Sequence, residues 1–408
     1  MPLRPRLFVC SLLVSLSLGL SSAAQANFRP VSISGSASRP ADPLTSSAFD
    51  QFYNLEYPRA VESFQQILQR HPDDPFAVNH LLTTVLMREL YRMGAMNSGE
   101  YANDSFIGNT HHPADPKVKE QIQKLVERAE DLEEARLKAN PKDVDALYAR
   151  GVTRADFALY TALIERAWFS ALRNAVGARR DHEQVLSLDP KYTDAKLVVG
   201  THLYVLGSLP WSVKVAVAMV GLSGSKEKGI QYLYDVANSN GESRVDAKVV
   251  LAVFLRRERR YEESLKIIRS LSQEYPKNLL FALEEGNLLR AEGHNPDAAA
   301  IYRKVFEAGR SGHYPGLHYE LAALSLGDLL RSQKNYRDAA SAYRGVESVK
   351  DADSEYRQRA ALSAGQMYDT MQERDSAVKQ YQAVIGIDGK SQQADAARKC
   401  LEDPCGNE

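Results

Sequence analysis

The chain has 408 residues, 44% of them hydrophobic, and it carries 51 Lys and Arg against 52 Asp and Glu for a net charge of −1. This length and apolar fraction allow a large hydrophobic core. A nearly neutral chain gives no electrostatic reason to bind nucleic acid or an anionic membrane, so we expect neither as the main partner.

Residues 1–26 have the pattern of a cleaved secretory signal peptide. Arg4 and Arg6 precede an apolar run from Leu7 to Leu20, and Ala-Gln-Ala at 24–26 is a small-x-small cleavage site. As a helix this run would reach about 21 Å, short of a bilayer core of about 30 Å, which argues against the alternative of a retained membrane anchor. We therefore expect an exported chain, most simply in a bacterial periplasm.

Residues 27–46 are rich in Ser, Pro and Gly and show no helical period, so we expect a flexible linker there.

Residues 47–242 are predicted to form an irregular array of helix pairs. In the second helix of each pair, a small residue is followed by larger apolar residues at steps of four and three, which places them on one helix face. The copies are Ala60, Phe64, Ile67; Ala178, His182, Val185; Gly229, Leu233, Val236; and a weaker copy around Ala129.

Two inserts interrupt this half. Residues 94–116 are rich in Gly, Asn, Asp and Pro and are predicted to form a loop. Residues 207–224 contain Pro210 followed by an apolar stretch, 211–220, predicted to be an extra helix.

Residues 243–390 repeat the same pattern regularly, with a period of about 34 residues. The second helices carry Ser264, Ile268, Leu271; Ala298, Tyr302, Val305; Ala339, Tyr343, Val346; and Ala377, Tyr381, Val384. The first helices carry a small residue twelve positions before each copy: Ala252, Gly286, Gly327 and Gly365. Small residues let paired helices approach closely, and the aromatic ring fills the space beside them.

At these residues the sequence resembles the tetratricopeptide repeat family, over most of residues 48–400. The resemblance implies an all-α, right-handed superhelical solenoid of about seven to eight antiparallel helix pairs. It also implies a scaffold that binds a protein or peptide partner on its concave face. The segment 200–233 is in addition similar to the tetratricopeptide repeat protein 39 family, whose members are intracellular; the signal sequence conflicts with this, so no function is carried over.

Alignment with the family places five polar side chains in the concave groove: Arg256, Asn287, Arg290, Asp328 and Arg331. These are the predicted partner-binding residues. The family's Lys–Asn grip on a terminal carboxylate is absent, because Leu283 stands one turn before Asn287.

Residues 391–408 are predicted to form a polar, Ala-rich capping helix and a short tail. Cys400 and Cys405 are expected to form a disulfide in an oxidising compartment, with unpaired thiols as the alternative.

No phosphate-binding loop, dinucleotide fingerprint, zinc-protease or nucleophile-elbow motif is present. His111 and His112, with Asp115, are the best metal candidates, but a solvated loop explains them with fewer assumptions. We therefore expect no enzyme activity, no cofactor and no metal.

Two further alternatives stay open. The apolar insert near Trp211 could line a lipid or small-molecule site, or touch a membrane surface, although burial between helices is the simpler interpretation. The arginines at 256, 257, 259 and 260 could bind an anion, but cations at a helix C-terminus are also favoured by the helix dipole.

Overall fold

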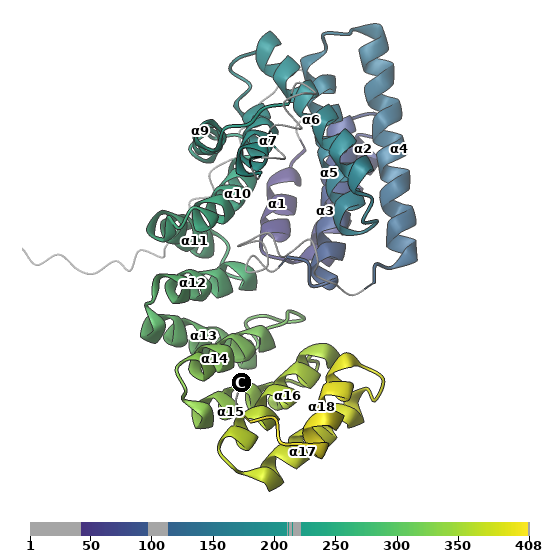
Figure 1. Ribbon diagram of the computed structural model, residues 1–408. Coiled ribbons are helices and arrows are strands. Elements are labelled where there is room, and N and C mark those ends of the chain that lie inside the picture. The colour runs from purple at the N-terminus through teal and green to yellow at the C-terminus, as the bar shows by residue number, and fades with distance from the viewer. Residues whose placement is uncertain (1–41, 97–112, 210, 212–213, 215–221, 407–408) are drawn as a thin grey trace, which may run out of the picture.

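The computed structural model describes residues 42–96, 113–209, 211, 214 and 222–406 (Figure 1). Within these ranges all regular structure is helical, with seventeen α-helices, two short 3-10 helices and no strand. Consecutive α-helices pack as pairs, and neighbouring pairs pack on one another. The predicted all-α helical solenoid is confirmed.

The described helices form eight pairs and a terminal cap. The pairs are α1 (Thr45–Tyr53) with α2 (Tyr57–Arg70), α3 (Pro75–Arg92) with α4 (Pro116–Ala139), α5 (Val144–Leu163) with α6 (Trp168–Leu188), α7 (Lys196–Ser208) with α9 (Lys226–Ala237), α10 (Arg244–Arg257) with α11 (Tyr261–Glu274), α12 (Leu279–Glu292) with α13 (Asn295–Arg310), α14 (Glu320–Ser332) with α15 (Tyr336–Arg344) and α16 (Ser354–Thr370) with α17 (Arg374–Ile387); α18 (Gln392–Glu402) is the cap. The 3-10 helices are Thr193–Ala195 and Gly345–Ser348.

Helix α1 begins inside the segment expected to be a linker. Asp42 anchors the chain there, because its carboxylate accepts a hydrogen bond from the Leu44 N–H (2.8 Å) and pairs with Arg70 (3.0 Å) and His71 (3.0 Å). The last two residues of the 27–46 segment are therefore helical.

In the regular half, the turns between the two helices of a pair share one backbone conformation. Gly293 lies between α12 and α13 with a φ of 93°, in the left-handed region that glycine adopts without strain. Non-glycine residues take the same place in the other regular pairs, with φ of 59° at Arg259 and 61° at Lys334 and Gln372. This repeated turn sets the crossing of the paired helices.

Glycine–tyrosine contacts hold the paired helices of the regular half together. A Cβ atom placed at Gly286 would lie 2.5 Å from the Tyr302 ring, and Gly365 stands in the same relation to Tyr381. Gly327 faces Tyr343 in the same way. All three rings are fully buried, as their spacing predicted.

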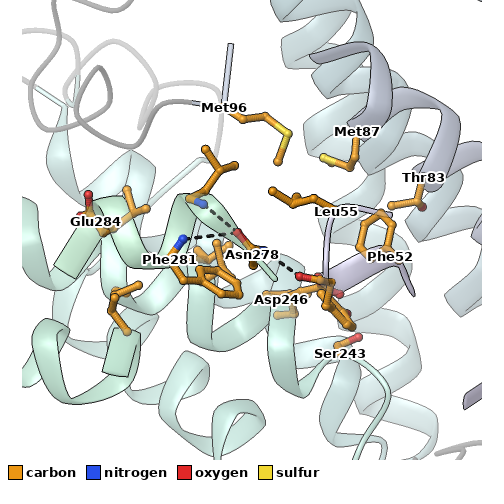
Figure 2. A pocket seen from close by; sticks show the side chains of 18 of the residues that line it. Phe52, Leu55, Thr83, Met87, Met96, Ser243, Asp246, Asn278, Phe281 and Glu284 are labelled. Carbon is orange, nitrogen blue, oxygen red and sulfur yellow. Dashed lines mark hydrogen bonds between the residues drawn. The ribbon is translucent and has the colours of Figure 1, made fainter. Parts of the chain in front are cut away.

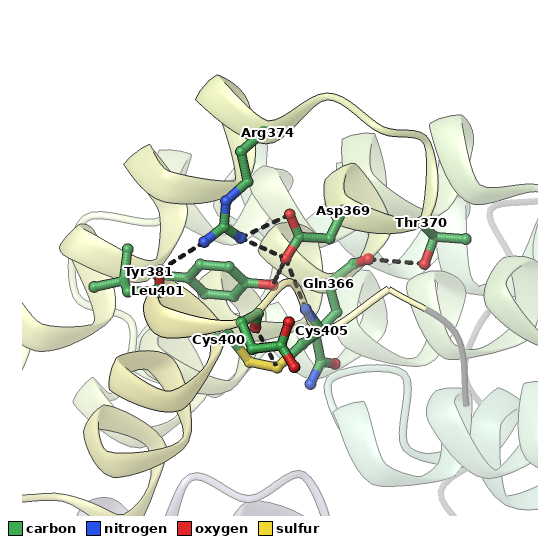
Figure 3. Close-up of a disulfide and its surroundings, with 9 residues drawn as sticks. Gln366, Asp369, Thr370, Arg374, Tyr381, Cys400, Leu401 and Cys405 are labelled. Carbon is green, nitrogen blue, oxygen red and sulfur yellow. Dashed lines mark hydrogen bonds and ion pairs between the residues drawn. A yellow bond between two sulfur atoms is a disulfide. The ribbon is translucent and has the colours of Figure 1, made fainter.

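The C-terminal cap is joined to the last repeat by covalent and polar contacts (Figure 3). A disulfide links Cys400 to Cys405, and the Cys405 N–H donates to Asp369 at 3.0 Å. Arg374 pairs with Asp369 (3.0 Å) and also donates to the Leu401 carbonyl (2.8 Å). The tail is thereby fixed to the end of α16.

The N-terminal helices reach the regular half through space. Figure 1 shows α1 between α3 and α10, inside the curve of the array. The Asn278 side chain donates to the Tyr53 carbonyl (2.7 Å), Lys277 pairs with Glu56 (2.6 Å), and Tyr53, Leu55 and Tyr57 belong to the same hydrophobic core as the helices from α10 to α16. The repeat pattern did not predict this closure.

Candidate binding cavity

A central cavity of about 790 Å³ lies between the N-terminal helices and the regular half (Figure 2). Most of its lining comes from the first helices of pairs, namely α1, α3, α5, α10, α12 and α14. These are the helices that the repeat pattern places on the concave face. The cavity is therefore the predicted groove, narrowed on one side by α1.

One part of the cavity wall is apolar and consists of aromatic rings and flexible aliphatic and methionine side chains. Phe52 and Leu55 lie near Met87 and Met96, and Phe281 lies on α12 (Figure 2). Methionine side chains adapt to differently shaped apolar groups, and aromatic rings supply large contact areas. This wall suits apolar side chains of a ligand.

Four of the five predicted partner-binding residues line the cavity: Arg256, Asn287, Arg290 and Asp328. Arg331 does not, because it lies exposed beyond the last turn that reaches the lining.

Three of these four residues also make contacts within the protein. Arg256 forms a two-pronged pair with Glu284 (2.8 and 2.9 Å). Asn287 accepts from the Tyr302 hydroxyl (2.8 Å), and Asp328 accepts from the Tyr343 hydroxyl (2.6 Å) and pairs with Arg359 (2.6 Å). Alignment placed these side chains correctly but did not show that they serve helix packing.

Arg290 differs from its neighbours, since it makes no hydrogen bond or ion pair with the residues that the structure describes. It lies half-buried in the cavity wall. An arginine in this position can offer a planar set of N–H donors to a ligand.

Four carboxylates line another part of the cavity, near α5 and the start of α10: Asp156, Asp194, Glu242 and Asp246. We call this group the acidic end. Burial raises the pKa of Asp156 to about 7 despite a hydrogen bond from Thr83 (2.6 Å), and burial likewise raises the pKa of Asp246 to about 7. Burial penalises the charged form, and the like charges of nearby carboxylates add to the effect.

Two histidines, a tyrosine and a serine also line this end. His80 interacts with Glu242, and the Tyr148 and Ser243 hydroxyls lie 3.0 Å apart. His182 is fully buried, with its Nδ1 2.8 Å from the Ala178 carbonyl, and burial lowers its pKa to about 4. Because a carbonyl only accepts, Nδ1 carries the proton and Nε2 is left as an acceptor.

Sequence reasoning missed the acidic end. Asp246 lies in the first turn of α10, where an acidic residue is ordinary. Asp156 follows two arginines in α5 and resembles part of a solvated face.

Several predictions fall on other parts of the chain. The signal peptide 1–26, His111 and His112, and most of the 211–220 helix lie outside the described residues. Asp115 is described and caps α4. Within the described ranges no three His, Cys, Asp or Glu side chains are arranged to hold a metal ion, and no helix there has the length and hydropathy needed to cross a bilayer.

Part of the regular half is similar in sequence to a known repeat family. Residues 283–355 match the tetratricopeptide repeat family. No curated protein sequence matches the chain.

Similar solved structures include Pseudomonas aeruginosa pilF, which is 16% identical, covers 61% of this chain and 97% of its own, and gives a TM-score of 0.36. The APC/C hetero-tetramer Cut9–Hcn1 is 12% identical over 88% of this chain and 55% of its own, with a TM-score of 0.44. A tetratricopeptide repeat protein from Parabacteroides merdae is 16% identical over 78% and 97%, with a TM-score of 0.33. Such distant likenesses carry no argument about function.

Proposed function

We propose that this helical-repeat chain, whose residues 283–355 match the tetratricopeptide repeat family, is an exported scaffold that binds a segment of a polypeptide partner in its central cavity. The observation that supports this proposal is the presence of the cavity. Its volume of about 790 Å³ falls within the range of about 300–1,000 Å³ that is typical of ligand sites.

The composition of the lining favours a polypeptide. An apolar wall of aromatic and methionine side chains lies beside polar side chains from several helices. An extended peptide presents alternating side chains and regularly spaced backbone groups, so it can use both kinds of surface at once. Arg290, which has no partner among the described residues, is the side chain best suited to a backbone carbonyl or a carboxylate.

Export is the second part of the proposal, and it rests on the signal pattern of residues 1–26. N-terminal sequencing of the chain recovered from an expressing bacterium tests it. We expect a start at or near Asn27 in the soluble envelope fraction. An intact Met1 would contradict export.

Site-specific photo-cross-linking tests the binding function. A photoreactive amino acid in place of Val253, which lines the cavity, is expected to capture a polypeptide in exporting cells. The same amino acid in place of Lys379, exposed on α17, is the control and is expected to capture none.

The same experiment also distinguishes the scaffold from the alternative of a lipid or small-molecule carrier. Capture of lipid instead of polypeptide at Val253 would favour a lipid carrier. Polypeptide capture only at Lys379 would place the partner on another surface and contradict the proposal.

A further inference from the structure

Three exposed apolar side chains gather at the start of helix α6. Phe169 is 93% exposed, Trp168 is 43% exposed and Leu172 is 48% exposed, and all three lie within five consecutive residues. Single exposed apolar side chains are ordinary, but a cluster of them marks a surface that meets another molecule. We call these three residues, together with Arg173 and Arg180, the α6 patch.

The α6 patch lies on the outer side of its helix. Ala171, Ala178 and Val185 are buried and form the inner face of α6. At about 100° per residue, Phe169 and Arg180 project from nearly the same side of the helix, roughly opposite that inner face. None of the five patch residues belongs to the lining of the central cavity. A molecule bound to the patch therefore leaves the cavity free.

The α6 patch is positively charged, although the whole chain is nearly neutral. Residues 167–180 contain three arginines and no acidic residue. Arg173 and Arg180 are exposed and make no hydrogen bond or ion pair with the described residues. The carboxylates in and just before α6 are already paired: Glu165 with Lys119, Asp181 with Arg150 and Arg154, and Glu183 with Arg179. The patch thus keeps two uncompensated positive charges beside its apolar side chains.

A second exposed tryptophan follows α7, the next helix along the chain. Trp211 is 79% exposed, so its side chain does not pack between helices, and Lys214 is exposed as well. Arg179 on α6 donates to the Ser223 carbonyl (3.3 Å), which places the end of the insert 207–224 beside this helix. The exposed aromatic side chains and the unpaired arginines therefore belong to neighbouring parts of one helix pair and the next.

An anionic membrane surface fits the α6 patch better than a second copy of the chain. A two-fold dimer brings the same surface of two copies together, so Arg173 and Arg180 would meet like charges. Tryptophan and phenylalanine favour the boundary between lipid headgroups and acyl chains, and arginines are attracted to anionic headgroups. A fluid bilayer also adapts to the protruding Phe169 ring, whereas a rigid partner needs a matching hollow for it.

We propose that the α6 patch docks the protein on a membrane surface that contains anionic lipids. Trp168 and Phe169 enter the headgroup region of the bilayer, and Arg173 and Arg180 lie beside the lipid phosphates. This inference goes beyond the proposed function and does not rest on it, because the patch and the cavity lining share no residue.

Tryptophan fluorescence of the purified exported chain tests the proposal. The chain has two tryptophans, Trp168 and Trp211, so in a Trp211→Phe variant the whole signal comes from Trp168. Vesicles of phosphatidylcholine with phosphatidylglycerol are expected to shift its emission to shorter wavelength, and lipids brominated on their acyl chains are expected to quench it. Vesicles of phosphatidylcholine alone should bind about 25-fold more weakly, since each arginine near an anionic surface contributes about fivefold.

Two variants of the patch, made in the Trp211→Phe background, separate its charge from its apolar side chains. Arg173→Gln with Arg180→Gln is expected to weaken binding to the anionic vesicles about 25-fold. Phe169→Ser is expected to weaken binding at least about tenfold on either kind of vesicle, because it removes the burial of a large apolar side chain. Circular dichroism melting shows that each variant is folded.

Matched controls remove similar groups from other surfaces. Arg303→Gln with Lys304→Gln takes two exposed charges from α13, and Ile387→Ser takes a partly exposed apolar side chain from the end of α17. Both controls are expected to leave vesicle binding within about twofold of the parent, as for an ordinary surface change.

Three results would overturn the membrane proposal: an unchanged Trp168 emission with anionic vesicles, equal losses in the patch and control variants, or self-association that Phe169→Ser abolishes. Sedimentation analysis without vesicles measures the last of these, which would show that a second copy of the chain covers the patch. The cross-linking at Val253 tests the cavity separately, so either proposal can fail while the other stands.

Discussion

Three buried tyrosines of the regular half each contact two positions on the paired helix. Each ring covers a glycine, and each hydroxyl donates to a polar side chain of the concave face: Tyr302 to Asn287, Tyr343 to Asp328 and Tyr381 to Asp369. A buried hydroxyl that loses its acceptor costs about 1–3 kcal/mol. A change at Asn287 or Asp328 would therefore lower stability as well as binding.

Gly327→Leu tests the packing at this scale. The added side chain would overlap the Tyr343 ring, and we expect a loss of about 1–3 kcal/mol in the free energy of unfolding, or more, because overpacking forces neighbours to move. Gly386→Leu on the exposed side of α17 is the control, since a Cβ atom there meets nothing within 4 Å. Equal melting temperatures for the two variants would argue against the assigned register.

Arg290 and Arg331 occupy equivalent positions in consecutive repeats, but Arg290 alone of the two lines the cavity. We expect Arg290→Ala to weaken peptide binding about tenfold, the usual effect of losing a charge-assisted hydrogen bond. Arg331→Ala should leave binding within twofold of wild type, roughly the scatter for a surface change. Isothermal titration with a peptide from the partner captured at Val253 measures both, and equal losses would place the ligand along the whole repeat face.

Asp156 makes stability depend on pH. Its pKa in the folded chain, raised to about 7, lies above its ordinary value of 3.8. The folded state therefore holds the proton more tightly, and this contribution to stability is fully present below about pH 4 and is lost as the pH rises through 7.

Replacing Asp156 with Asn removes that loss and keeps an acceptor for the Thr83 hydroxyl. We expect the variant to be more stable than wild type at pH 8, by roughly 1–3 kcal/mol, and the difference to shrink towards pH 5. Chemical denaturation at both pH values measures it, with exposed Asp131→Asn as the control. A difference that grows on acidification would contradict the burial of an unpaired carboxyl.

At the scale of helices, the first and the last helix of the described array pack differently. Helix α18 covers the last pair, and the disulfide and Asp369 hold its tail. Helix α1 turns inward and lies beside α10 and α12, where its residues join the core of the regular half. One end of the solenoid is capped, and the other forms part of the cavity wall.

Cys400→Ser with Cys405→Ser tests the role of the disulfide. So short a loop contributes at most about 2 kcal/mol through chain entropy, so we expect a small change in global stability. Hydrogen exchange should instead rise locally in residues 392–406. Faster exchange throughout α16 and α17 would show that the disulfide supports the whole last repeat.

For the whole molecule, contacts between distant segments close the array around the cavity. Tyr91 stacks on His318 with ring centroids 5.8 Å apart, and its hydroxyl accepts from the His318 N–H (3.3 Å). These two contacts of Tyr91 join the N-terminal helices to the regular half, together with the contacts of Tyr53 and Glu56 to the segment before α12. The size of the cavity depends on this closure.

Tyr91→Ala is expected to loosen the closure, because it removes both the stacked ring and the hydrogen bond. Spin labels at Glu130 on α4 and Lys379 on α17, both exposed, report the separation of the two halves. We expect a longer or broader distance distribution than in the labelled parent, whereas Tyr261→Ala on α11, away from this contact, should leave it unchanged. An unaltered distribution in Tyr91→Ala would mean that the α1 contacts suffice.

The repeats themselves were predictable. The steps of four and three identified the buried faces, and the tyrosines and their glycine partners lie where the pattern placed them. Four of the five groove residues were likewise placed on the cavity wall by alignment. The buried faces were predictable because helical period and pair packing are local properties, determined by residues within one repeat. That the groove residues bind a partner stays a prediction.

Only the tertiary structure brought α1 into the concave face and joined Asp156 to Asp246 in one cavity. These residues lie on different repeats, and their approach depends on small rotations that accumulate from pair to pair. The sequence by itself determined which residues each helix buries and where each pair turns. The curvature of the whole array decided which distant side chains meet, because the energy that closes the array comes from contacts between segments far apart in the chain.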